Sequence, residues 1–424
     1  FGSTGLDKGL AVTRDLNNNV LIAGLFELTV DFGGGPLTSA GSTDIFVAKY
    51  SSAGVHIWSS RFGGNNVDVA WSIGCDNNGD VFVTGQFRDS IDFGGGTLTS
   101  AGLSDIFVIK LSGASGSHIW SKRFGNSLGD DVGYALATTS NGDVVIGGLF
   151  YQSIDFGNGS ILSSFGGQSG FVARLSGVNG SQIWAKAFWK TGWYIVYGLA
   201  IDSSDNVFAT GYFNSKINFG GTEFTSFGYP DVFLVKLSGD GAHIWSKQFG
   251  GTSDEMAYGI AADSIGDVVI TGFFKGTANF GGSSLTSAGM TNIFMAKYSG
   301  IDGAHIWSKR AGSNDQDYGK SVTTDGSNNV IFTGYFHNSV SFGGAILTAS
   351  GTNVDIYVVK YDSLGNHIWS VRYGGTASDV GLSVATDSNN NVLLTGYFIG
   401  KVNMNGTILN SAGSGDIFLL KMAG

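Results

Sequence analysis

Six acidic residues occupy one aligned position in a segment that the chain repeats, and Tyr194 takes the seventh such position. The acids are Asp7, Asp68, Asp131, Glu255, Asp317 and Asp379. Carboxylates gathered around one opening would attract cations or a basic partner. This spacing raises the hypothesis of an acidic ring at a central mouth of the fold.

Arginine residues offer a second interpretation of these acids. Four acids follow an arginine by seven or eight residues, namely Arg61 before Asp68, Arg123 before Asp131, Arg310 before Asp317 and Arg372 before Asp379. Where the arginine becomes Ala187, the acid becomes Tyr194. Bases and acids that vanish together favour structural ion pairs. We therefore expect Arg123 to pair with Asp131, and Arg310 with Asp317, leaving no open carboxylate ring and no bound cation.

A group of aromatic residues breaks the repeat in two neighbouring segments. These candidate binding residues are Trp189, Trp193, Tyr194, Phe165, Phe227 and Tyr229. Exposed rings bind the apolar faces of sugars or anchor a partner protein. The alternative is a repacked loop that fills the space left by the missing ion pair. A binding patch requires Trp189, Trp193, Tyr194, Phe227 and Tyr229 to lie together on one face, with at least two rings exposed.

The remaining polar motifs favour structure over catalysis. The turns at 76–80 and 387–391 lack the alternating acidic ligands and the distal glutamate of a calcium loop. Asn and Gly tolerate positive φ, so we interpret these segments as tight turns. Five of the six histidines share one strand position and would lie far apart in a ring. No nucleophile elbow, phosphate loop or His-Glu-x-x-His motif occurs. We predict no catalytic residue, no metal and no cofactor.

Composition narrows the function further. The 424 residues carry a net charge of −10, which argues against nucleic acid, because its phosphates require a basic surface. With 42% hydrophobic and 13% charged residues, the chain is not disordered. No apolar stretch approaches the roughly 20 residues of a membrane helix, so we predict no membrane span. A single cysteine, Cys75, excludes disulfides within the chain.

A Gly-x-Phe motif recurs seven times, at intervals of 61 to 63 residues. Each segment holds four short apolar runs bounded by Asn, Asp, Gly and Ser, a pattern typical of antiparallel all-β meanders. Four such strands repeated around an axis form the blades of a β-propeller. We predict one all-β, seven-bladed domain over 1–424, with four-stranded antiparallel blades. The expected blades span about 8–62, 68–125, 131–188, 194–249, 255–311, 317–373 and 379–424.

The strands also indicate which edge of a blade faces the axis. First strands alternate small and branched residues, as crowding near an axis requires. Fourth strands carry Trp, Lys and Arg, which suit an outer edge. Six Trp-bearing fourth strands serve seven first strands. We therefore expect residues upstream of Phe1 to complete blade seven, and residues 1–3 to lie beside the C-terminal segment.

The repeats resemble those of bacterial secreted and surface β-propeller proteins, the SBBP type. The resemblance rests on recurring phrases such as Asp-Phe-Gly-Gly, Leu-Thr-Ser-Ala-Gly, Asp-Ile-Phe-Val-x-Lys and His-Ile-Trp-Ser-x-Arg-Phe-Gly-Gly, and it covers the whole chain. It implies a bacterial extracellular or cell-envelope setting. Propellers host many activities, so the resemblance is specific for architecture rather than function.

Three functions follow as hypotheses. The leading one is a non-enzymatic surface scaffold that presents its loop face to a protein partner. The second is a glycan-binding module that uses the aromatic residues. The third, an enzyme acting at the axial mouth, is disfavoured because the first strands supply mostly small residues there. The expected partner is thus a protein or a glycan.

Overall fold

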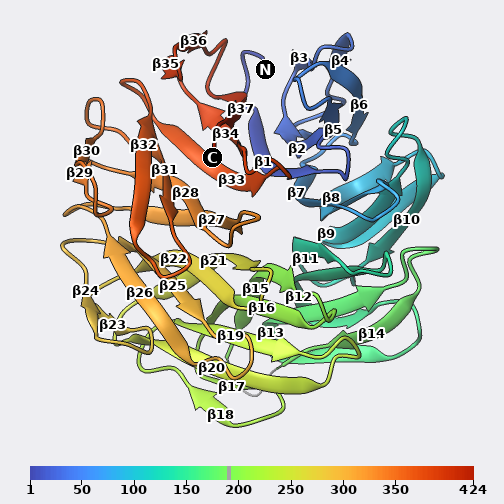
Figure 1. Ribbon diagram of the computed structural model, residues 1–424. Coiled ribbons are helices and arrows are strands. Elements are labelled where there is room, and N and C mark those ends of the chain that lie inside the picture. Colours follow the sequence, from blue (N-terminus) through green and yellow to red (C-terminus); the bar gives the residue numbers. More distant parts are fainter. Residues whose placement is uncertain (189–191) are drawn as a thin grey trace. The chain divides into compact units, whose positions relative to one another are not determined.

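The computed structural model describes residues 1–188 and 192–424, without the side chains of residues 165 and 166. The described residues form strands and turns and no helix. They build a seven-bladed β-propeller with six four-stranded antiparallel blades and three strands in blade seven, which confirms the predicted fold class (Figure 1). Contacts group the chain into one unit of residues 1–188, 193–199 and 412–418, and a second of 192, 200–411 and 419–424. A single domain over 1–424 stays a prediction.

Seven sets of long strands form the blades. Blade one contains β1 (Lys8–Arg14), β2 (Val20–Phe26), β5 (Asp44–Tyr50) and β6 (His56–Phe62). Blade two contains β7 (Val69–Cys75), β8 (Val81–Asp92), β9 (Thr97–Leu111) and β10 (His118–Phe124). Blade three contains β11 (Val132–Thr138), β12 (Val144–Asp155), β13 (Ile161–Leu175) and β14 (Gln182–Lys186). Blade four contains β15 (Tyr194–Ile201), β16 (Val207–Phe213), β19 (Asp231–Leu237) and β20 (His243–Gly251). Blade five contains β21 (Glu255–Ala262), β22 (Val268–Phe274), β25 (Asn292–Tyr298) and β26 (His305–Ala311). Blade six contains β27 (Tyr318–Thr324), β28 (Val330–Phe336), β31 (Asp355–Tyr361) and β32 (His367–Tyr373). Blade seven contains β33 (Asp379–Thr386), β34 (Val392–Phe398) and β37 (Asp416–Met422).

Short hairpins between the second and third strands were not among the predicted strands. They are β3 (Thr29–Asp31) with β4 (Pro36–Thr38), β17 (Lys216–Asn218) with β18 (Glu223–Thr225), β23 (Thr277–Asn279) with β24 (Leu285–Thr286), β29 (Ser339–Val340) with β30 (Leu347–Thr348), and β35 (Lys401–Met404) with β36 (Thr407–Asn410). In blades two and three the long strands themselves continue into this region. Asp31 orders the first hairpin, because its Oδ1 accepts the N–H groups of Gly33 and Gly35. The Asp-Phe-Gly-Gly phrase is therefore a hairpin turn.

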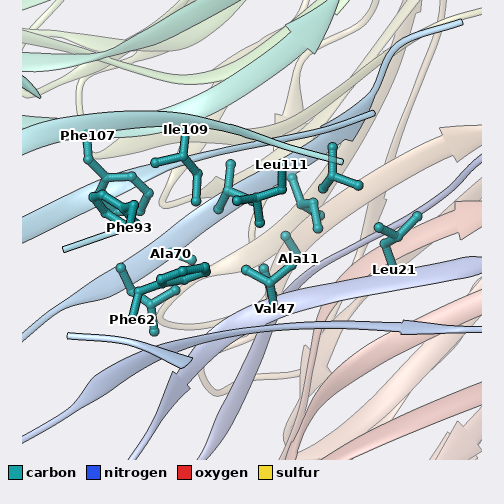
Figure 2. Packing of buried hydrophobic residues seen from close by; sticks show 14 of the residues in the cluster. Ala11, Leu21, Val47, Phe62, Ala70, Phe93, Phe107, Ile109 and Leu111 are labelled. Carbon is teal, nitrogen blue, oxygen red and sulfur yellow. The ribbon is translucent and has the colours of Figure 1, made fainter. Parts of the chain in front are cut away.

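The second and third strands are buried on both faces. Every residue of β5, β19, β25 and β31 is buried. Such strands appear in the sequence as continuous apolar runs, because neither face meets water. Figure 2 shows a cluster in which Phe107, Val47 and Ala70 pack together from neighbouring blades. Each large side chain buried in this way contributes about 1.5–3 kcal/mol of transfer free energy.

The Gly-x-Phe motif lies where the first strand bulges against the second. In blade one the register shifts between Gly9 and Ala11, and the carbonyl oxygen of Lys8 lies against Gly24. A β-carbon at Gly24 would overlap that oxygen. The same close approach recurs at Gly85, Gly148, Gly272 and Gly334. The motif therefore records a backbone contact that only glycine permits.

Replacing Gly85 by alanine should lower the free energy of unfolding by about 1–3 kcal/mol, because the added methyl group meets the Val69 carbonyl. Urea unfolding measures the loss. Gly326→Ala is the control, since only the side-chain oxygen of Asn390 lies near that position, at 3.1 Å. Equal stability of the two variants would contradict the steric argument.

An ion pair joins the third strand of each blade to the turn between its first two strands, and it is buried in blades one to six, whereas Lys421 of blade seven is 33% exposed. In blade one, Lys49 Nζ lies 2.8 Å from Asp15 Oδ2. The equivalent pairs are Lys110 with Asp76, Arg174 with Asp143, Lys236 with Asp202, Lys297 with Asp263, Lys360 with Asp325, and Lys421 with Asp387. Lys49 also donates to the carbonyl of Gly113 in blade two, at 2.7 Å, and Trp58 Nε1 donates to the same oxygen. The aspartates interpreted as turn residues thus also neutralise a buried cation.

The first residue of the chain pairs with the last long strand. The Phe1 amino group donates to Ile417 O at 2.8 Å, and Ile417 N donates to Phe1 O at 2.7 Å. The Phe1 ring packs 5.6 Å from the rings of both Phe32 and Tyr50. This contact confirms that the start of the chain lies beside the C-terminal segment.

Candidate functional site

The six aligned acids are buried rather than exposed around a mouth. None has accessible surface. Asp68 accepts hydrogen bonds from Gly64 N at 2.8 Å and from Arg88 N at 3.0 Å. Asp7, Asp131, Asp317 and Asp379 accept equivalent bonds from two loops, and Glu255 accepts one from Gly251 N. The five aspartates fasten the loop before the first strand to the backbone that follows the Gly-x-Phe motif, so the acids do not form an exposed ring.

The predicted ion pairs of these acids are wrong. Arg123 pairs with Asp105 of the third strand instead of with Asp131. The reason is strand pairing: Arg123 lies opposite Phe107, whose side chain points to the same face as that of Asp105, two residues away. The equivalent contacts join Arg61 to Asp44, Arg372 to Asp355 and Arg310 to Asn292. Arg61, Arg123 and Arg372 thus neutralise an aspartate of the third strand, whereas Arg310 donates to a neutral amide.

The aligned acids lie close to the third-strand aspartates. Burial, together with the charge of Asp44, raises the pKa of Asp68 to about 7. Burial, together with the charge of Asp231, raises the pKa of Glu255 to about 8. Shifts of this size are common at active sites. Here the carboxyl groups have no accessible surface, so a substrate has no direct route to them.

The candidate aromatic residues differ in exposure. Phe227 is 62% exposed, Tyr229 is 64% exposed, and Trp193 is 37% exposed. Trp189 and the side chain of Phe165 lie outside the described residues. Whether the whole set forms one surface stays a prediction.

Tyr194 does not offer a surface ring. It is buried, its hydroxyl donates to the carbonyl of Gly170, and the same oxygen accepts the N–H of Phe188. Glycine at position 170 leaves the room that this ring occupies. Tyr194, at the start of blade four where the aligned acid is missing, therefore joins two segments of blade three, as the packing alternative requires.

A cluster around Lys320 was not among the sequence candidates. Lys320 Nζ lies 4.1 Å from the ring centroid of Tyr258, 5.1 Å from that of Tyr318 and 5.6 Å from that of Tyr335. Burial lowers the pKa of Lys320 to about 8. The aromatic faces attract the charged form, whereas the neutral amine is a nucleophile and a proton acceptor. The available sequence signal was a lysine at a first-strand position that holds Leu, Trp or Tyr in the other blades.

A pocket of about 390 Å³ lies between blades four and five. Phe227 and Phe249 contribute rings to its lining, and Lys247, Asn279 and His305 contribute polar groups. An exposed ring beside hydrogen-bonding groups can contact the apolar face of a ligand and also orient it.

The described residues offer few other groups for metal binding or nucleophilic chemistry. Within residues 1–188 and 192–424, no group of three or more His, Cys, Asp or Glu side chains is placed to hold a metal ion. The same residues contain no helix long and apolar enough to cross a membrane. Burial raises the pKa of the Cys75 thiol to about 12, which keeps it protonated and unreactive.

No family model matches the chain. An uncharacterized WD repeat-containing protein of Acanthamoeba polyphaga mimivirus is 25% identical over 94% of this chain, which spans only 36% of that protein. BamB from Moraxella catarrhalis is 13% identical with a TM-score of 0.39, covering 91% of this chain and 96% of BamB. The Dos1 propeller is 10% identical with a TM-score of 0.46, covering 96% and 93%. At these values the likenesses assign no activity, and membership of the SBBP type stays a prediction.

Proposed function

We propose that this protein is a surface scaffold that binds a protein partner through the loop of residues 226–230 in blade four. The observation that carries the proposal is the exposure of Phe227 and Tyr229, at 62% and 64%. The WD-repeat name of the viral relative supports a role in protein interaction. The extracellular or cell-envelope setting is part of the proposal and follows from the resemblance of the repeats.

Phe227 and Tyr229 replace small residues that some other blades carry at the same positions, so the repeat itself does not explain the two rings. Ala40, Ala101 and Ala288 stand at the position of Phe227. The Phe227 N–H donates to Asp231 Oδ2 at 3.2 Å, as the Ala40 N–H donates to Asp44. This backbone hydrogen bond therefore forms equally well without an aromatic side chain. A large exposed ring on an anchored loop suits a partner's pocket, where aromatic residues supply much of the binding energy.

Changing Phe227 to Ala and Tyr229 to Ser restores the residues that blade one carries at these positions. Partner affinity should fall by at least tenfold, because each lost anchor removes on the order of 1–2 kcal/mol or more. The unfolding temperature should hardly change, since both side chains are largely exposed. Retention of proteins from a cell-envelope extract on immobilised wild type and variant, followed by titration of the retained protein, measures the effect.

The matched control is Ile301→Ala with Leu364→Ala. Both side chains are exposed, at 88% and 73%, and both lie in turns between third and fourth strands. This variant should retain the partner. Equal retention by all three proteins would exclude the blade-four loop as the binding site. A large loss of stability in the Phe227 and Tyr229 variant would instead assign the rings to packing.

A glycan is the second candidate ligand, favoured by the pocket beside Phe227. Sugars combine an apolar face with hydroxyl groups, and the pocket offers a ring together with Lys247, Asn279 and His305. A glycan array probed with wild type and with Asn279→Ala tests this candidate. Glycan binding that is lost in Asn279→Ala would support a glycan ligand. If no glycan binds but a protein partner is retained, only the scaffold function remains.

A further inference from the structure

Five blades carry in their third strand an aspartate that has one side-chain oxygen without a hydrogen-bond donor. These residues are Asp44, Asp105, Asp231, Asp355 and Asp416. In each, Oδ2 accepts a backbone N–H from four or five residues earlier. Among the described residues, no donor reaches Oδ1, which is buried. A buried carboxylate oxygen without a donor is costly, so its repetition in five blades requires a cause.

Blade five carries asparagine at this position and shows what the orphan oxygen faces. Asn292 Oδ1 accepts the Ala288 N–H at 2.7 Å, as Oδ2 of the aspartates does. Its Nδ2 occupies the place of the orphan oxygen. This amide nitrogen donates to Ser313 O at 2.8 Å, and it lies 3.3 Å from Asp317 Oδ2, which also accepts from it. The surroundings of the orphan oxygen are thus hydrogen-bond acceptors.

Blade four has the same geometry with two carboxyl groups. A β-carbon built on Gly250 would lie 2.7 Å from Asp231 Oδ1 and 2.8 Å from Glu255 Oε2. The equivalent atom on Gly312 in blade five would lie 2.8 Å from Asp317 Oδ2 and also against Asn292 Nδ2. The two acids of blade four therefore flank one glycine, as the amide and the acid do in blade five.

We propose that each buried pair of carboxyl groups binds one proton, carried as an O–H group where Asn292 carries its N–H. The third-strand aspartate then donates to the acceptors that Asn292 Nδ2 contacts, and its orphan oxygen is satisfied. The proton also removes the repulsion between two neighbouring anions. The pairs are Asp44 with Asp68, Asp105 with Asp131, Asp231 with Glu255, Asp355 with Asp379, and Asp416 with Asp7.

The charged groups around each pair determine how firmly it holds the proton. Arg61, Arg123 and Arg372 face three of the pairs, and Asp130 lies near the second. Around Asp231 and Glu255, the neutral Gln248 replaces arginine and Asp254 adds a negative charge. Blade four therefore holds its proton most firmly, and burial raises the pKa of Asp231 to about 6 and that of Glu255 to about 8.

A metal ion fits these pairs poorly. Calcium takes six to eight oxygen ligands, whereas each pair brings only two carboxyl groups, which in blade four pack against Gly250. Three pairs already contact an arginine. An amide at the same position in blade five is a hydrogen donor and would repel a cation. The feature that all six blades can share is a hydrogen-bond donor, an amide N–H in blade five and a carboxyl O–H in the other five.

Proton binding makes stability depend on pH with a definite sign. The folded protein holds these protons at pH values where the unfolded acids, with pKa values of about 4, have lost them. The folded state therefore binds more protons, and its stability falls as the pH rises from about 4 to about 8.

Two reciprocal variants test the proposal by urea unfolding at pH 5 and pH 8. Asn292→Asp creates a sixth pair, and its unfolding constant relative to wild type should be roughly tenfold larger at pH 8 than at pH 5, because one pKa unit corresponds to a factor of ten. Asp231→Asn removes one pair, and the same ratio should be roughly tenfold smaller at pH 8. Failure of Asn292→Asp to fold at pH 8 alone would also support the proposal.

Ratios that do not change with pH in both variants would overturn the proposal. So would selective rescue of Asn292→Asp at pH 8 by millimolar calcium or magnesium, because a metal ion would then be the ligand. Infrared spectra at pH 7 give an independent measurement. A protonated-carboxyl band that is weaker in Asp231→Asn than in wild type supports the proton, and an unchanged band argues against it.

Discussion

Replacing Asp325 by alanine should lower the free energy of unfolding by about 3–5 kcal/mol, because it leaves a buried ammonium group without its anion. Lys360 Nζ lies 2.8 Å from Asp325 Oδ2, and the two side chains are 7% and 0% exposed. Asp325 also accepts hydrogen bonds from Ser327 N and Asn329 N. Urea unfolding at pH 7 of the variant and of wild type measures the loss.

Asp362→Ala is the matched control, since Asp362 accepts the same kind of turn hydrogen bonds, from Leu364 N and Asn366 N, on a more exposed turn. It should cost far less, and the difference isolates the ion pair. Burial alone would raise the pKa of Asp325, but hydrogen bonds from Lys360 and Asn329 outweigh it and lower this pKa below its usual value. The gap between wild type and Asp325→Ala should therefore narrow as the pH falls below about 4. Equal losses in both variants would show that the turn alone stabilises.

Replacing Trp120 by alanine should also cost about 3–5 kcal/mol, the usual loss for a large buried ring. Trp120 is 7% exposed, its ring packs 5.8 Å from that of Phe82, and its Nε1 donates to the carbonyl of Gly177 at 3.2 Å. The substitution leaves a cavity and removes one of the two hydrogen bonds to the Gly177 carbonyl, the other being donated by Lys110. Thermal and chemical unfolding monitored by circular dichroism would report the loss.

Trp193→Ala provides the comparison, because Trp193 is 37% exposed. We expect a clearly smaller loss of stability there. If the two tryptophan variants are equally destabilised, Trp193 belongs to the packing of blade three and cannot serve as a binding residue.

The architecture was predictable because the same pattern of strands recurs in every repeat. Seven copies of one strand pattern reduce the effect of any ambiguous segment, and Gly24 with its equivalents sits at the same bulge in successive blades. The short hairpins were harder to predict, since β29 and β30 have only two residues each. Strands this short leave no periodic signal.

The partners of the arginines were mispredicted for a specific reason. Spacing along the chain connected Arg123 with Asp131, whereas strand pairing places it beside Asp105, 18 residues earlier. A signal for the correct partner was present: in blade three, where Ala187 replaces arginine, Ser169 replaces the third-strand aspartate. Cross-strand neighbours follow from register, which the sequence specifies only once the strands are paired.

The candidate site was predictable only in part. Exposure of Phe227 and Tyr229 agreed with their departure from the repeat, but the hydrogen bonds that bury Tyr194 depend on Gly170, 24 residues away. Lys320 was overlooked because one lysine in a strand gives no motif. Its lowered pKa arises from burial among rings contributed by three different strands.

The contact of Lys49 with the carbonyl of Gly113 in the following blade has an evolutionary consequence. Lys110 with Gly177, Lys236 with Gly300 and Lys297 with Ser363 repeat the contact, so blades two and five each carry one donor for the following blade and one acceptor for the preceding blade. A tandem duplication of either of these two blades would therefore bring both the donor and the acceptor of the new junction. Copy number in such a lineage can change by recombination without a compensating substitution at the boundary.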